Sequence, residues 1–242
     1  MTVRARAPSG RGPLGNTPMS PTVVALVVVN VVVFLASRSN PAQVYLRFAM
    51  IPARVHQGQW YRLVTAAFLH ANPEHILFNM IILLVIGSPV EALVGRVRFG
   101  AIYLIAGIGG SVCSYLLSAA DIEGIGASGA IFGLFGAYAV LARRRRFDTR
   151  LVLILIVIEL VISFADPGID WRAHIGGLIV GAAVTWGFSA VRAWRPVRRR
   201  TGELLVGAVV VGVLAMAVTL PPGHVNLSSF AVSELMASIS TS

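Results

Sequence analysis

The sequence contains no lysine, only one cysteine and few charged residues of any kind. Of its 242 residues, 12% are charged and 56% are hydrophobic, and the mean hydropathy is +0.79. A soluble globular domain needs charged groups over its surface, so this composition excludes an ordinary soluble protein. Cys113 has no second cysteine to pair with, which excludes an intrachain disulfide and leaves the redox compartment undetermined.

Long apolar runs fill most of the chain instead. Several reach the roughly 20 residues that a helix needs to cross about 30 Å of hydrocarbon. The sequence therefore predicts an all-α polytopic membrane protein. We expect seven spans, near residues 22–37, 63–87, 99–119, 127–142, 151–165, 172–191 and 203–220.

The net charge of +10 comes from arginine, and the arginines follow the predicted spans. They cluster at the N-terminus and after the second, fourth and sixth spans, whereas the opposite loops hold only five. This positive-inside pattern predicts a cytoplasmic N-terminus and an external C-terminus. It also accounts for the run of four arginines at 143–146, so we expect no nucleic-acid partner. The abundance of Ala, Val, Gly and Arg without lysine suggests a GC-rich bacterial genome and a plasma membrane location.

The chain divides into a helical core and flanking segments. We expect a disordered basic cytoplasmic tail at 1–21, a six-helix core at 22–192, an arginine-rich hinge with a seventh helix at 193–220, and an external polar tail at 221–242. The basic start followed by an apolar run also resembles a signal peptide, with cleavage near Ala36. Six further spans favour a first helix that is retained.

The loop between the first two spans, about residues 38–62, carries an amphipathic stretch at 44–55. Trp60 and Tyr61 follow this stretch. Their amphipathic rings suit a membrane interface, so we expect this external loop to lie there.

Glycines recur along the fourth and sixth spans. Gly129 with Gly133, and Gly177 with Gly181, have the small-xxx-small spacing that lets helix backbones approach closely in lipid. The spacing serves packing, and it also allows polar residues on the two spans to meet.

Polar residues occur near the outer ends of the second, fourth and sixth spans, which all run in the same direction. Ser128 lies near the start of the fourth span and His174 near the start of the sixth. Polar groups inside a bilayer are costly and usually mark function. A serine hydroxyl becomes a good nucleophile when a neutral imidazole removes its proton, so we expect a catalytic Ser128–His174 pair. Asp166 and Asp170 lie in an external loop, and a dyad without an acidic third member is the simpler hypothesis.

Other residues could support this pair. His75 and Asn79 are four residues apart and share one helix face, where both can donate hydrogen bonds to an oxyanion. Gly126 and Gly129 flank Ser128 and leave room for a substrate backbone. Phe132 lies one turn after Ser128, where its ring could stack on the imidazole or simply fill a helix interface.

A metal site is the competing interpretation of the histidines. His70, His75 and His174 could act as ligands, but no cysteine or carboxylate is well placed to join them. We therefore expect no metal and no cofactor, and we expect His70 to order the loop before the second span. Glu91 is predicted to join Arg96 and Arg98 at the inner end of that span.

The chain resembles the rhomboid family of intramembrane serine proteases. The motifs that carry the resemblance are WYR at 60–62, HANPEHILFN at 70–79, GASGAIFG at 126–133 and AHIGGLIVG at 173–181, and the match covers about residues 22–192. The resemblance implies a six-helix core, Ser128 as nucleophile, His174 as general base, and His75 and Asn79 as oxyanion donors. It also implies that the fifth span gates substrate access. The implied substrates are single-span membrane proteins, cut at a small residue near the outer membrane boundary.

Two other classes of function remain open at this point. One is a non-catalytic membrane scaffold or chaperone that recognises transmembrane helices, for which Ser128 would be dispensable. The other is a transporter or channel that uses the polar cluster as a proton relay. The oligomeric state and the identity of any substrate cannot be derived from the sequence.

Overall fold

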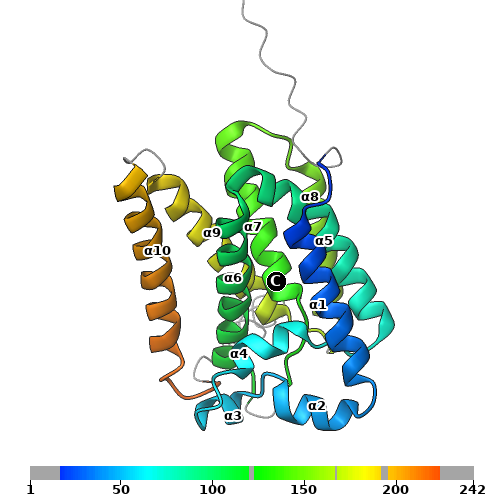
Figure 1. Ribbon diagram of the computed structural model, residues 1–242. Helices are drawn as coiled ribbons and strands as arrows, with labels where there is room; N and C mark the ends of the chain where they lie inside the picture. The colour runs from blue at the N-terminus through cyan, green and yellow to red at the C-terminus, as the bar shows by residue number, and fades with distance from the viewer. Residues whose placement is uncertain (1–16, 120–122, 167, 192–195, 224–242) are drawn as a thin grey trace, which may run out of the picture.

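The computed structural model describes residues 17–119, 123–166, 168–191 and 196–223 (Figure 1). Every regular element within these ranges is helical, apart from one isolated β-bridge between Met50 and Gly124. The all-α fold class is therefore confirmed. The expectations for residues 1–16, for residues 193–195 at the start of the predicted hinge and for the tail at 224–242 lie outside the described residues.

Seven long helices correspond to the seven predicted spans: α1 (Pro21–Ser37), α5 (Pro73–Val94), α6 (Arg96–Leu117), α7 (Ser128–Arg145), α8 (Arg150–Ala165), α9 (Trp171–Ala190) and α10 (Pro196–Ala217). By length and composition alone, α5, α6, α9 and most of α10 can each cross a membrane, and α1 is a shorter apolar helix. The chain is thus a multi-pass membrane protein. Four short elements lie between α1 and α5: α2 (Pro41–Phe48), α3 (Pro52–His56), α4 (Arg62–Thr65) and the 3₁₀ turn η1 (Ala66–Phe68).

The predicted start of the second span is wrong. Helix α5 begins at Pro73, not near residue 63, because Asn72 caps it: the Asn72 side-chain oxygen accepts the N–H of His75 at 2.7 Å. Proline at the first helical position reinforces this start. The apolar residues that precede it form α4 and η1, so hydropathy alone merged two separate elements.

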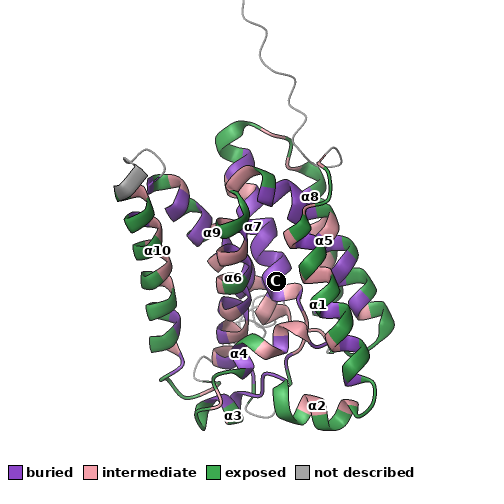
Figure 2. Ribbon diagram, viewed as in Figure 1, coloured by how far each residue is buried: buried purple, intermediate pink, exposed green. Residues whose placement is uncertain are grey.

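Helix α7 lies in the centre of the bundle (Figure 1). It packs most extensively on α9, then on α6, and most of its residues are buried (Figure 2). Phe135 and Tyr138 of α7 belong to the largest apolar core cluster. Helix α10 stands at the edge and is largely exposed (Figure 2). The start of α7 therefore places Ser128 among the other core helices.

Glycines bring the backbones of α7 and α9 into direct contact, which confirms the expected small-residue packing. A Cβ atom on Gly177 would overlap the carbonyl oxygen of Gly129, and one on Gly181 would overlap the backbone of Gly133. Any larger side chain at these positions would force the two helices apart.

Glu91 forms a hydrogen-bonded network near the C-terminal end of α5. It accepts the hydroxyl protons of Ser20 and Thr22 before and within the first turn of α1, and it lies 3.7 Å from the Arg96 guanidinium. The network ties the start of α1 to the end of α5.

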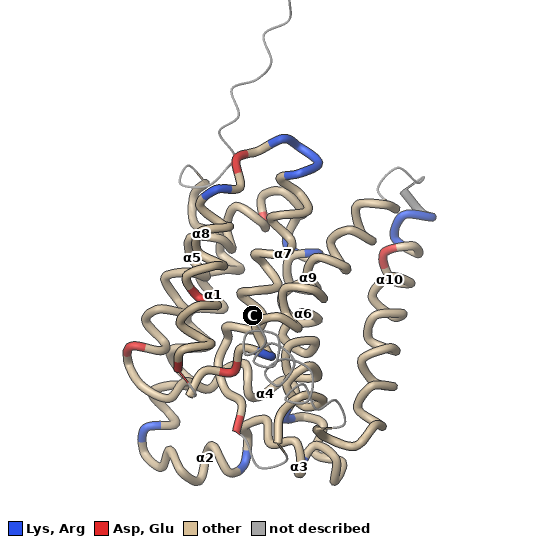
Figure 3. Tube along the Cα trace, turned by 180° about the vertical axis from the view of Figure 1, so that it is seen from behind, with Lys and Arg blue, Asp and Glu red and all other residues tan. Residues whose placement is uncertain are grey.

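Arg98 does not join this network, so that part of the expectation is wrong. Its guanidinium pairs with Glu203 of α10 at 2.9 Å, a partner that the sequence reasoning did not identify. The pair fixes α10 to α6. Figure 3 shows arginines at the α7–α8 connection and at the start of α10, at the end of the bundle opposite α2 and α3.

Arg62 organises the loop between α1 and α5. Its buried guanidinium donates to the carbonyl oxygens of Leu46 and Ala49, both at 2.7 Å, and to the side chain of Gln59 at 2.8 Å. The Arg62 side chain thereby holds the C-terminal end of α2 against the start of α4. Trp60 beside it is 63% exposed.

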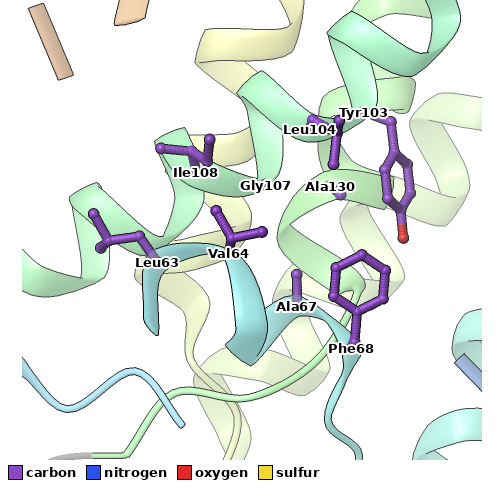
Figure 4. Close-up of a pocket in the computed structure, with 9 residues that line it drawn as sticks. All are labelled: Leu63, Val64, Ala67, Phe68, Tyr103, Leu104, Gly107, Ile108 and Ala130. Carbon is purple, nitrogen blue, oxygen red and sulfur yellow. The ribbon is translucent and has the colours of Figure 1, made fainter. Parts of the chain in front are cut away.

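The same loop packs closely on α6. Figure 4 shows Leu63, Val64 and Ala67 facing Leu104 and Ile108 across an apolar gap. The gap has a volume of about 10 Å³, room for one water molecule at most. It carries no polar lining and is too small to bind a substrate.

Candidate active site

Ser128 is the first residue of α7, and the segment before it is held by the loop between α1 and α5. Met50 and Gly124 exchange two backbone hydrogen bonds of 3.0 and 2.8 Å, and the N–H of Gly126 donates to Ala66 at 3.0 Å. Gly126 has φ +125°, a conformation that favours glycine. These bonds fix the direction from which the chain approaches Ser128.

His174 lies in the first turns of α9, whose start is capped by Asp170. The Asp170 carboxylate accepts the N–H groups of Arg172 at 3.1 Å and Ala173 at 3.4 Å. Asp166 accepts the N–H of Gly168 at 2.8 Å in the preceding turn. Both aspartates thus organise the loop and the helix start, and neither contacts the imidazole through a hydrogen bond that the structure records.

The structure brings Ser128 and His174 together across 46 residues of sequence. The hydroxyl oxygen of Ser128 lies 2.8 Å from Nε2 of His174. The Phe132 ring stacks on the imidazole, with 4.3 Å between ring centroids and 6° between ring planes. His174 is only 3% exposed, and both the stacking and the hydrogen bond at Nε2 restrict its ring.

His75 and Asn79 face the same space as this pair. Together with Ser128 and His174 they line a cavity of about 740 Å³, which Glu159 of α8 also lines. One amide proton of Asn79 is used within α5, where Nδ2 donates to the carbonyl of His75 at 3.0 Å. The second amide proton is available to another acceptor.

The two glycines named with the site have different surroundings. A Cβ on Gly126 would lie 2.8 Å from Nε2 of His75, so glycine there leaves room for the His75 ring. A Cβ on Gly129 would lie 3.3 Å from the carbonyl oxygen of Ala173, so this glycine permits close contact with α9.

His70 lies outside the residues that line the cavity. It is fully buried between η1 and α5, its ring meets the His75 ring edge-on with centroids 5.0 Å apart, and its carbonyl accepts the Tyr45 hydroxyl proton at 2.7 Å. Burial and the nearby His75 lower the pKa of His70 to about 3. The ring is therefore neutral and supports His75 from behind. Among the described residues, no three His, Cys, Asp or Glu side chains are grouped so as to hold a metal ion.

Ser163 of α8 is a site residue that the sequence reasoning missed. Its hydroxyl oxygen lies 2.8 Å from Nδ1 of His174 and 2.6 Å from the carbonyl oxygen of Glu159. The sequence-based hypothesis takes only the carboxylates Asp166 and Asp170 as possible third partners of the imidazole. One signal was present: α8 and α9 are antiparallel neighbours joined by a short loop, which brings residues on either side of that loop to similar depth.

The chain matches known proteins over the region that contains this site. Residues 57–191 match the rhomboid domain model. The chain is 39% identical over 167 residues to the rhomboid protease GluP of Bacillus subtilis, a match that covers 67% of this chain and 32% of that protein. It is 30% identical over 192 residues to the rhomboid protease AarA of Providencia stuartii, covering 67% of this chain and 66% of that protein.

The chain is also similar to a plant protein. RHOMBOID-like protein 1 of Arabidopsis thaliana is 40% identical over 136 residues, which cover 52% of this chain and 34% of the plant protein. The matched region thus spans from about a third to two thirds of these relatives. With a domain match over more than half of its residues, this chain belongs to the rhomboid family.

Proposed function

We propose that this chain is an intramembrane serine endopeptidase that cleaves transmembrane proteins with Ser128 and His174. The observation that carries the proposal is the 2.8 Å separation between the Ser128 hydroxyl oxygen and Nε2 of His174, beside a cavity of about 740 Å³. The names of the bacterial relatives GluP and AarA, both rhomboid proteases, support it.

The reaction is acyl transfer to serine followed by hydrolysis. His174 accepts the Ser128 proton at Nε2 as the oxygen attacks the scissile carbonyl, and the resulting imidazolium then protonates the leaving amine. In the second half of the reaction His174 removes a proton from water, and the water oxygen attacks the acyl carbonyl. The imidazolium then returns the proton to the Ser128 oxygen as the acyl group leaves. The stacked Phe132 ring keeps the imidazole plane fixed through both steps.

The oxyanion of the tetrahedral intermediate needs donors on the cavity side of Ser128. Three residues that line the cavity carry candidate donors: Ser128 with its backbone N–H at the start of α7, Asn79 with its remaining amide proton, and His75 with its ring. The first N–H groups of a helix have no partner within the helix and carry its positive dipole end. Donors fixed before the reaction stabilise developing charge without reorganising.

The substrates in this proposal are single-span membrane proteins cut at a small residue near the outer membrane boundary. The arginines of residues 143–146 end α7 at the opposite end from Ser128. Under the positive-inside rule that end is cytoplasmic, so Ser128 lies toward the outside and the N-terminus is cytoplasmic. The membrane is the plasma membrane of a bacterium.

A fluorophosphonate probe tests this function on purified protein in detergent. Covalent labelling of wild type, with no labelling of Ser128→Ala, is the expected result. Absence of labelling together with retained binding of transmembrane helices would support a scaffold instead. Substrate flux in proteoliposomes without labelling would support a transporter.

A further inference from the structure

Ser163 of α8 is buried, although the residues on either side of it in the sequence are exposed. It is 2% exposed, whereas Ile162 and Phe164 beside it are 44% and 59% exposed on the outer surface of α8. Its burial therefore results from its contact with α9, where its hydroxyl reaches Nδ1 of His174 at 2.8 Å. It is also absent from the residues that line the cavity, so it stands behind the imidazole and away from substrate.

The hydrogen bonds of Ser163 fix the position of its proton. A carbonyl oxygen can only accept, so the bond of 2.6 Å to Glu159 requires Ser163 to donate its single hydroxyl proton there. The 2.8 Å contact with His174 then requires Nδ1 to be the donor and Ser163 Oγ the acceptor. A neutral imidazole protonated at Nδ1 has a free lone pair at Nε2, which faces the Ser128 hydroxyl.

We propose that Ser163 is a positioning residue that holds His174 in the Nδ1-protonated tautomer, so that Nε2 can accept the proton of Ser128. This inference rests on the proposed function for its catalytic consequence, but the tautomer itself does not depend on protease activity. In this arrangement the Ser128 hydroxyl donates to Nε2 of His174. Nδ1 of His174 donates to the Ser163 hydroxyl, which in turn donates to the carbonyl oxygen of Glu159 in α8. A neutral hydroxyl here takes the orienting role that a carboxylate has in a Ser-His-Asp triad.

Removal of the hydroxyl leaves Nδ1 without its acceptor. The imidazole can then carry its proton on Nε2, and in that form it cannot take the proton of Ser128. We expect Ser163→Ala to lower kcat by roughly 10- to 100-fold, as for residues that orient a reacting group, with KM unchanged because Ser163 does not line the cavity.

Two further variants separate hydrogen bonding from packing. Ser163→Cys keeps a side chain of similar size but offers a weak acceptor, so it should be impaired like Ser163→Ala. Ser163→Thr keeps the hydroxyl, which in a helix can still bond the carbonyl four residues back, so it should recover most of kcat. Ser37→Ala is the matched control: its buried hydroxyl likewise bonds a carbonyl in its own helix, that of Phe34 at 2.7 Å, but Ser37 lies in α1 and does not line the cavity.

Nitrogen-15 NMR of the histidine rings measures the tautomer directly, with the His174 signals assigned by their loss in His174→Gln. Wild type and Ser163→Thr should show a protonated Nδ1 and an unprotonated Nε2, and Ser163→Ala and Ser163→Cys should show the Nε2-protonated form gaining population. An unchanged tautomer in Ser163→Ala would overturn the inference, as would equal kcat losses in Ser163→Ala and Ser163→Thr. A wild type that shows no protease activity but the expected tautomers would contradict only the proposed function.

Discussion

Gly181 of α9 lies directly against the backbone of Gly133 in α7. A Cβ on Gly181 would overlap the Gly133 carbonyl oxygen and Cα. Gly181→Val should therefore push α9 away from α7 and separate His174 from Ser128. Displacement by about 1 Å can cost roughly 100-fold in rate when catalysis depends on geometry. Cleavage of a reporter substrate should fall by that order, and Tm should fall as well.

Gly212→Val provides the control for this prediction. Gly212 lies in α10, and a Cβ there would meet nothing within 4 Å. Activity and Tm should stay close to wild type. If Gly181→Val behaved like Gly212→Val, the close contact between α7 and α9 would not be what brings the dyad together.

Asn79→Ala removes an oxyanion donor in the proposed mechanism. Turnover should fall by roughly 10- to 1000-fold, the range for loss of one such donor, with little change in substrate affinity. His75→Ala should show a similar or smaller loss, since the remaining donors still act. Steady-state kinetics with a detergent-solubilised substrate give kcat and KM separately.

Asn30→Ala is the matched control for Asn79→Ala. In both residues the side-chain nitrogen donates to the carbonyl four residues back, at 2.8 Å for Asn30 and 3.0 Å for Asn79, but Asn30 lies in α1 and does not line the cavity. Its replacement should leave kcat unchanged. A rise in KM with intact turnover in Asn79→Ala would show that Asn79 binds substrate and does not stabilise the oxyanion.

Arg62→Lys should lower both Tm and activity, although the charge is retained. A lysine ammonium lacks the planar fork with which the guanidinium reaches the carbonyls of Leu46 and Ala49 together. The exposed Arg54 in the same loop supplies the control, since Arg54→Lys should leave Tm unchanged. Equal melting temperatures for Arg62→Lys and Arg54→Lys would mean that the loop is held by other contacts.

The buried His70 predicts a pH dependence of stability. Its pKa is about 3 in the folded protein and about 6.5 in an unfolded chain, so the unfolded state binds more protons between these values. The free energy of unfolding should therefore fall as pH drops below about 6.5. His70→Asn removes this component, so the Tm difference between wild type and variant should narrow with falling pH. A difference that stays constant would contradict the buried, neutral state of His70.

The approach of α7 to α9 could be predicted because its determinants are local in sequence. The spacing of Gly129, Gly133, Gly177 and Gly181 marks two helix faces, and alternating spans give both helices the same direction. The start of α5 could not be predicted from hydropathy alone, because the apolar residues from Leu63 to Leu69 and those after His75 are separated by only six residues, which include the cap at Asn72.

The partners of single side chains were harder to predict. Arg98 and Glu203 are 105 residues apart, and nothing in the sequence links them. Ser163 depends on the rotation of α8 about its axis, which decides whether residue 163 faces α9 or lipid. Apart from Glu159 and Ser163 themselves, the residues that follow Arg150 in α8 are apolar on every face, so hydropathy does not indicate this rotation.

Cleavage of a single-span reporter substrate in proteoliposomes tests the central claim most directly. The proteins compared are wild type, Ser128→Ala, His174→Ala and the double variant, each with the same Tm as wild type. The 2.8 Å contact between the two side chains predicts that each single change abolishes cleavage. Because the residues act as a unit, the double variant should be no slower than either single variant. Cleavage by Ser128→Ala at a rate near that of wild type would contradict the account.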